Sequence, residues 1–244
     1  MTNKDYQIKI PEEVKARYEA LKNKLESFKK ELLKKFDKYV LGIALLPPEK
    51  PPTEDESKPT EKEKEEIKNK INILILVDDS DSKNIESFGL RDKLFAIVEK
   101  IAKETDQNFK PEVLLNSELV ENCYDGKYEI LNLIANSGVI YDPSDMLAAI
   151  KISQVHKSMV LTKFDKYIVS YIAAGSLFRG EKSNDIDVFI LVDDTDVKKM
   201  SRFELRDRLR AIIIQLGFQA ADITGVKKQF HIQVYILTDF WEWV

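Results

Sequence analysis

The sequence predicts an α/β (α+β) protein with two tandem units, each a small mixed sheet flanked by helices, preceded by an N-terminal amphipathic helix. Short apolar runs typical of buried strands alternate along the chain with longer segments of helical periodicity. One such arrangement also occurs twice, since residues 71–97 and 186–212 are identical at 15 of 27 aligned positions. Chance does not produce such a match, so we interpret the chain as a tandem duplication of one unit.

The composition restricts the class of protein. The 244 residues are 43% hydrophobic and 33% charged, which is enough for a sizeable core beneath a highly charged surface. The net charge of −4 argues against a general nucleic-acid coat protein, and the single cysteine, Cys123, excludes a disulfide framework or a zinc cluster. Because the sequence has no signal peptide and no apolar run of membrane-spanning length, we expect a cytoplasmic protein with no membrane partner.

Residues 1–35 are predicted to contain the N-terminal amphipathic helix. Apolar side chains recur there at alternating spacings of four and three, and so form one seam among lysines and glutamates. We favour packing of this seam on the domain that follows, and the alternative is a coiled-coil arm that forms a homodimer. The seam consists of Val14, Tyr18, Leu21, Leu25, Phe28 and Leu32.

Residues 36–143 form the first predicted unit. Its first strand leads into residues 47–69, which carry five prolines and many charges and are therefore expected to be a mobile loop. The elements expected after this loop are a buried strand at 71–79, a helix at 88–103, a strand at 113–115, a helix at 125–135 and an extended segment at 138–141.

A linking helix, residues 144–163, leads to the second predicted unit, residues 164–244. This unit opens with FDKYI, which repeats the FDKYV at residues 36–40. Ser201, with Glu204 three residues later, predicts the start of a helix, and residues 230–237 predict a strand. Because two tryptophans follow this strand so closely, we expect either a chain truncated at its C-terminus or aromatic side chains that pack into a partner.

The candidate site lies in the second unit. Asp185 and Asp187 begin a strand, so their side chains point to the same face and converge on a position that suits a hard divalent cation. The preceding Gly175-Ser176 turn allows close backbone approach and exposes N–H groups that suit a phosphate. A phosphate-binding turn beside paired, metal-binding carboxylates is the equipment of phosphoryl or nucleotidyl transfer.

The order Gly175-Ser176, then Asp185-Ile186-Asp187-Val188, resembles the signature of the nucleotidyltransferase superfamily, which includes polymerase β-like and minimal nucleotidyltransferases. Three intervening residues also match the pattern of that loop: Arg179, Gly180 and Ser183. The resemblance implies that Asp185 and Asp187 are catalytic ligands of Mg²⁺ (or Mn²⁺). It also implies that the nucleotide triphosphate is bound by Gly175, Ser176, Arg179 and Ser183.

The implied activity is metal-dependent transfer of a nucleoside monophosphate from a triphosphate such as ATP to an acceptor hydroxyl on a protein, an RNA or a small molecule. The first unit does not retain this site. It has Pro47-Pro48 in place of the glycine and serine, and proline offers no N–H to a phosphate. It also has Lys70 and Asn72 at the positions of the two aspartates, so we interpret it as a degenerate, pseudo-enzyme domain.

The resemblance also implies a third carboxylate, but Gln233 stands near its expected position. Glu112 and Asp239 are alternative suppliers. Without a third carboxylate the chain is instead expected to be a catalytically weak or inactive nucleotide- or protein-binding module. A purely structural dimerisation protein leaves the paired aspartates unexplained. His231 is interpreted as an ordinary structural histidine, and the acidic run at residues 193–196, which recurs in the first unit, as structural.

Overall fold

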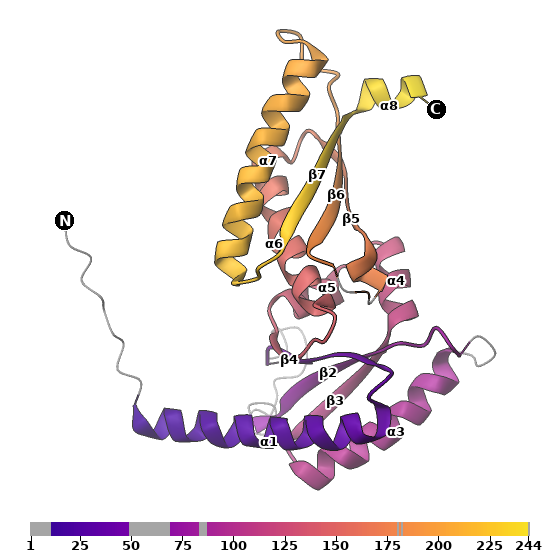
Figure 1. The fold of residues 1–244 in the computed structure, drawn as a ribbon, viewed down its shortest axis with the longest axis vertical. Coiled ribbons are helices and arrows are strands. Elements are labelled where there is room, and N and C mark those ends of the chain that lie inside the picture. The colour runs from indigo at the N-terminus through magenta and orange to yellow at the C-terminus, as the bar shows by residue number, and fades with distance from the viewer. Residues whose placement is uncertain (1–10, 49–68, 83–86, 180, 182, 244) are drawn as a thin grey trace, which may run out of the picture.

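The computed structural model describes residues 11–48, 69–82, 87–179, 181 and 183–243. It confirms a mixed α/β protein with two small mixed sheets (Figure 1). The predicted mobile loop at residues 47–69 lies almost wholly outside the described residues. Within the described ranges, no helix combines the length and apolar composition that spanning a membrane requires.

The first sheet has the strand order β3-β2-β1-β4, in which β1 is antiparallel to β2 and β4, and β2 is parallel to β3. One face packs on helices α1 and α3, and the other on α4, α5 and the first half of α6. The predicted helix at 125–135 is only α5, while α4 was not predicted. The elements are α1 (Glu12–Phe36), β1 (Val40–Leu45), β2 (Ile71–Val77), α3 (Ser87–Thr105), β3 (Phe109–Leu115), α4 (Asn116–Tyr124), α5 (Glu129–Ala135), β4 (Gly138–Tyr141) and α6 (Met146–Phe164).

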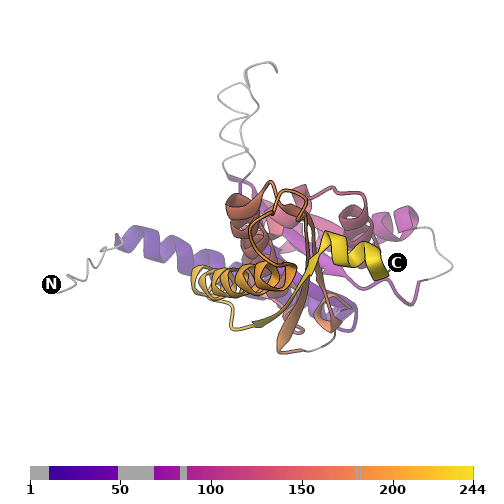
Figure 2. The ribbon, with the colours of Figure 1, turned by 90° about the horizontal axis from the view of Figure 1, so that it is seen from above.

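Helix α1 packs on the first sheet through Leu25, Phe28 and Leu32, which are buried in one core with Ile73 and Ile75. This confirms packing on the following domain for the C-terminal part of the seam, from Leu21 to Leu32. The N-terminal turns of α1, with Val14 and Tyr18, are exposed and project away from the rest of the chain (Figures 1 and 2). The coiled-coil homodimer stays a prediction.

The second sheet has the strand order β5-β6-β7, with β5 antiparallel and β7 parallel to β6. Its inner face packs on α6 and α7. The Ser201 side chain accepts a hydrogen bond from the Glu204 N–H at the start of α7, as the predicted cap requires. The elements are β5 (Ile168–Ala174), the 3₁₀ helix η1 (Ser176–Arg179), β6 (Asp185–Val192), α7 (Arg202–Thr224), β7 (Gln229–Ile236) and a short unpredicted helix, α8 (Leu237–Trp243).

The two sheets share a topology. The order strand, antiparallel strand, helix, parallel strand occurs as β1-β2-α3-β3 and again as β5-β6-α7-β7. In both sheets the first strand also begins with a register shift, after the pairs Val40↔Val77 and Ile168↔Val192. The likeness agrees with the predicted duplication, which itself stays a prediction.

Helix α6 joins the two units, with the first sheet below it and the second above it in Figure 1. Its Leu147 and Ile150 lie in the core of the first unit, while Ile152 and Val160 lie in that of the second. His156 is fully buried on α6, where its Nε2–H donates to the carbonyl oxygen of Ile213 at 3.0 Å. One continuous helix therefore fixes both sheets against each other.

Candidate active site

Strand β6 places Asp185 and Asp187 on the outer face of the second sheet. The alternate residues Ile186 and Val188 are fully buried in the core against α6 and α7. Because side chains alternate across a strand, the burial of these two residues turns both carboxylates away from the core. The predicted common face of the two aspartates is therefore present.

Gly175 lies directly against Asp187. Strand β5 pairs with β6 so that Ala174 is opposite Asp187, and the chain then turns at Gly175 with a φ of 111°. A Cβ at this position would lie 3.0 Å from Oδ2 of Asp187, which is closer than about nine in ten Cβ contacts in proteins. Both the backbone angle and the close approach favour glycine. The predicted turn and the predicted carboxylate are thus in contact.

The rest of the turn is the short helix η1, which begins at Ser176. The carbonyl oxygen of Ser176 accepts a hydrogen bond from the N–H of Glu181 at 3.1 Å, which closes the loop. Phe178 packs against the cores of both units and anchors the loop between them. The side chain of Arg179 lies outside the described residues, so its predicted contact with the nucleotide stays a prediction.

Among the described residues, each carboxylate has one close polar partner. The hydroxyl of Ser183 donates to Oδ1 of Asp185 at 2.6 Å. Nδ1 of His231 lies 3.0 Å from Oδ1 of Asp187, and both side chains are partly exposed. Ser183 was predicted to belong to the site as a nucleotide-binding residue, and it lies beside Asp185.

His231 lies beside Asp187 in the candidate site, while its interpretation as an ordinary structural histidine stays a prediction. Strands β6 and β7 pair in parallel with Asp187 opposite His231, which brings the two side chains together on the outer face. The sequence carried one signal, because His231 alternates with Gln229 and Gln233 on a strand whose other residues are apolar. Only the register, which sequence does not supply, identifies its partner.

No third carboxylate joins the pair among the described residues. Gln233 lies opposite Phe189, and its Oε1 accepts a hydrogen bond from the Tyr235 hydroxyl at 2.6 Å. Asp239 lies beyond the opposite end of β7 and binds Arg202 at 3.0 Å, while Glu112 pairs with Leu74 in the first sheet. The part of the chain that the structure describes contains no group of three or more His, Cys, Asp or Glu placed to hold a metal ion.

The first unit has a different arrangement at the corresponding positions. Asn72, which corresponds to Asp187 in the aligned repeats, is buried, and its Oδ1 has no hydrogen-bond partner among the described residues. Its carbonyl oxygen accepts the N–H of Leu46 at 2.9 Å, and Pro47 follows at once in place of Gly175. The first unit thus lacks both the paired carboxylates and the glycine turn.

The acidic run after β6 has a structural role at Asp194. Its Oδ1 accepts hydrogen bonds from the N–H and the hydroxyl of Thr238 and so fixes the start of α8. In the first unit Asp79 accepts the same two kinds of hydrogen bond from Ser117 at the start of α4. The matching hydrogen bonds of Asp194 and Asp79 confirm the structural interpretation, because Asp79 makes them in the unit that lacks the candidate site.

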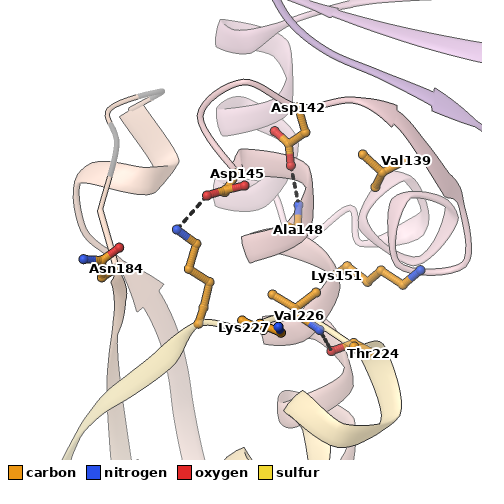
Figure 3. Close-up of a pocket in the computed structure, with 11 residues that line it drawn as sticks. Val139, Asp142, Asp145, Ala148, Lys151, Asn184, Thr224, Val226 and Lys227 are labelled. Atoms are coloured by element: carbon orange, nitrogen blue, oxygen red, sulfur yellow. Dashed lines mark hydrogen bonds and ion pairs between the residues drawn. The ribbon is translucent and has the colours of Figure 1, made fainter. Parts of the chain in front are cut away.

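A cavity of about 660 Å³ lies between the two units, next to the segment that precedes β6 (Figure 3). Lys228, whose side chain is only 10% exposed, forms an ion pair there with Asp145 at 2.8 Å, drawn as the dashed line at Asp145. The same ammonium group donates to the carbonyl oxygen of Ser183. Lys228 therefore links the start of α6 to the loop that precedes Asp185, a contact that no sequence pattern predicts.

No protein-family model matches the sequence, and no curated protein matches it either. The resemblance to nucleotidyltransferases therefore stays a prediction from the sequence motif.

Proposed function

We propose that the second unit is a metal-dependent nucleotidyltransferase, which moves a nucleoside monophosphate from a nucleoside triphosphate to an acceptor hydroxyl. The observation that carries the proposal is the contact between Gly175 and Asp187. A left-handed glycine packed against a carboxylate oxygen brings a phosphate-binding turn and a metal ligand to one place.

The residues present fit a divalent cation bound together with a nucleotide. Mg²⁺ is commonly held by one or two carboxylates plus phosphate oxygens of the substrate, and Asp185 and Asp187 supply two carboxylates on one face. The bound ion would neutralise charge on the phosphates during transfer. His231 and Ser183 would orient the two carboxylates through the hydrogen bonds described above.

The proposed step joins the acceptor oxygen to the α-phosphorus and breaks the bond between that phosphorus and the oxygen bridging to the β-phosphate. Pyrophosphate leaves, and the hydroxyl proton is released. The N–H groups of the turn at Gly175 and Ser176 would hold the phosphates in line for this displacement. Pro47 and Pro48 stand at this position in the first unit and lack those donors, so the activity is assigned to the second unit alone.

A second candidate function is a nucleotide-binding module with little or no transfer. One observation in its favour is that Gln233, near the expected position of a third carboxylate, accepts a hydrogen bond from Tyr235. The other is that no third carboxylate among the described residues lies beside Asp185 and Asp187. Both candidates require Asp185 and Asp187 to bind a metal–nucleotide complex. They differ only in whether pyrophosphate is formed.

Pyrophosphate release tests the proposal. The full chain is incubated with Mg²⁺, each of the four triphosphates and an acceptor from each class: protein, RNA or aminoglycoside. We expect release that depends on the metal and the acceptor, that is lost in Asp185→Asn and that is retained in Asp193→Asn. Asp193 is a matched control, because it lies just past the far end of the same strand and its side chain accepts the N–H of Thr195. Nucleotide binding without release would favour the second candidate.

A further inference from the structure

The outer face of the second sheet has an apolar half. We define the apolar outer patch as Val169, Ile172, Phe189, Leu191 and Tyr235, which alternate with the residues of the inner core. Val169 and Ile172 are 52% and 53% exposed, and the rings of Phe189 and Tyr235 stack at 6.4 Å. The described helices α6 and α7 lie together on the other face of this sheet (Figures 1 and 2).

The patch is separate from the candidate site. Along the outer face of β6, Asp185 and Asp187 come first, and Phe189 and Leu191 follow. Strand β7 runs parallel to β6, and on the same face its polar residues His231 and Gln233 come before its apolar residue Tyr235. An occupant of the patch can therefore leave the two carboxylates accessible.

The first sheet shows how an equivalent face is covered. Its topology and register assign one counterpart to each patch residue, and every counterpart is apolar. All five lie in a single core cluster, in which Ala44, Leu74 and Leu76 are buried. In the order of the patch residues, the counterparts are Leu41, Ala44, Leu74, Leu76 and Leu114.

The cover of that equivalent face is helical. Ile134 of α5 and Met146, Leu147 and Ile150 of α6 pack against these residues and are almost completely buried. The first unit thus shows which side chains cover the face of such a sheet. They belong to helices whose apolar stripe consists of leucine, isoleucine and methionine. No described helix does this for the apolar outer patch.

We infer that the apolar outer patch is a docking surface for an amphipathic helix of a partner protein, whose stripe of Leu, Ile and Met packs as α5 and α6 do on the first sheet. Exposed apolar surface contiguous across three strands marks interaction sites in globular proteins. The inference goes beyond the proposed function and does not depend on it, because it uses none of the candidate catalytic residues.

One difference between the sheets specifies the partner further. Gly42 allows Leu147 to approach the first sheet so closely that a Cβ on that glycine would lie 2.5 Å from the leucine Cδ1. The corresponding residue of the second sheet is Ser170, which has a Cβ and a hydroxyl. The partner helix therefore carries a small residue opposite Ser170.

The probe is a fluorescent peptide with the sequence of residues 128–158, which includes α5 and the covering half of α6, and with Leu147→Ala to fit Ser170. Its binding to the full chain is measured by anisotropy. We expect Ile172→Asp to weaken binding by about tenfold or more. The control Ile223→Asp, which changes a residue of α7 that is 67% exposed, should bind like the unaltered chain. Circular dichroism checks that both variants are folded.

Three outcomes would overturn the inference. The peptide fails to bind the folded chain, or both variants weaken binding equally, or the unaltered peptide with Leu147 binds more tightly than the alanine form. Sedimentation of the same samples tests a second copy as the occupant. If the chain forms a dimer that Ile172→Asp dissociates and Ile223→Asp does not, the patch is a self-association surface and the partner-helix assignment is wrong.

Discussion

The carboxylate of Asp145 lies 2.8 Å from the ammonium group of Lys228, and this ion pair joins the start of α6 to the segment that precedes β7. Lys228 also donates to the carbonyl oxygen of Ser183, whose hydroxyl in turn binds Asp185. A series of three contacts thus connects Asp145, at the start of α6, to Asp185, a predicted metal ligand. Asp145 adopts a φ of 61°, a left-handed conformation that aspartate tolerates better than most residues other than glycine.

Replacement of Lys228 should therefore affect both stability and the site. Lys228→Met leaves Asp145 without its cation and releases the loop before Asp185, so we expect a loss of about 1–3 kcal/mol in the free energy of unfolding. We also expect metal-dependent nucleotide binding to weaken. Urea titration and calorimetry measure the two effects. Lys227→Met, which changes the exposed neighbour, is the control, and an equal effect of both changes would contradict the assigned role of Lys228.

Gly175→Ala should damage the site more than the fold. An alanine there must adopt a left-handed φ and place its Cβ 3.0 Å from Oδ2 of Asp187, so the carboxylate has to move. We expect loss of nucleotide binding with a decrease of about 1–2 kcal/mol in unfolding free energy.

Gly225→Ala is the matched control for that change. Gly225 has a φ of 69° at the end of α7, and a Cβ on it would have no heavy atom within 4 Å. The two variants should lose similar stability, but only the change at Gly175 should abolish nucleotide binding. If binding survives in Gly175→Ala, the turn is not the phosphate-binding element.

His231→Ala should weaken metal-dependent nucleotide binding by about tenfold, because residues that orient metal ligands commonly contribute that much to metal affinity. Nδ1 of His231 contacts Oδ1 of Asp187, whereas Gln229, on the same face of β7, lies opposite Asp185. Gln229→Ala is therefore the comparison. Titration with Mn²⁺ in the presence of nucleotide distinguishes the two, and unchanged affinity in His231→Ala would show that Asp187 needs no such support.

The stability of the protein should fall as the pH falls below about 6.5, the ordinary pKa of histidine. Burial lowers the pKa of His156, which donates to the carbonyl oxygen of Ile213 and lies 2.9 Å from the hydroxyl of Tyr171. Between the lowered folded-state pKa and 6.5, the unfolded chain binds a proton that the folded chain does not. The unfolding free energy therefore decreases with decreasing pH in that window and is insensitive to this group above it.

Urea unfolding at several pH values between 5 and 8 measures this dependence, with a slope of at most about 1.4 kcal/mol per pH unit from this residue. His156→Gln retains a donor for the Ile213 carbonyl but has no proton to gain. Its slope below pH 6.5 should be smaller than that of the unaltered chain. Equal slopes would mean that folding does not lower the pKa of His156.

Much of the fold could be predicted from the sequence for two reasons. The strands are apolar runs, and the similarity between residues 71–97 and 186–212 lets one unit be compared with the other. The alternation in Asp185-Ile186-Asp187-Val188 specified the face of both carboxylates, and the burial of Ile186 and Val188 confirms it. Helices α4 and α8 were missed because each is short and directly follows a strand, so neither has enough length to show a helical period.

The contacts of the site depend on register and on packing between units, which local sequence does not encode. His231 meets Asp187 only because β7 pairs with β6 in that register, and Lys228 meets Asp145 only because α6 spans both units. The patch residues Val169 and Ile172 had no distinguishing pattern either. Their exposure follows from a difference between the two sheets. Described helices cover both faces of the first sheet but only the inner face of the second.

We propose that Asp185 and Asp187, together with the turn at Gly175, bind a metal–nucleotide complex. The decisive experiment is calorimetric titration of the full chain with ATP and the other triphosphates, with and without Mg²⁺, alongside Asp187→Asn and the control Asp193→Asn. We expect binding that requires Mg²⁺, disappears in Asp187→Asn and persists in Asp193→Asn. Absence of binding by every triphosphate, or equal binding by the two variants, would contradict it.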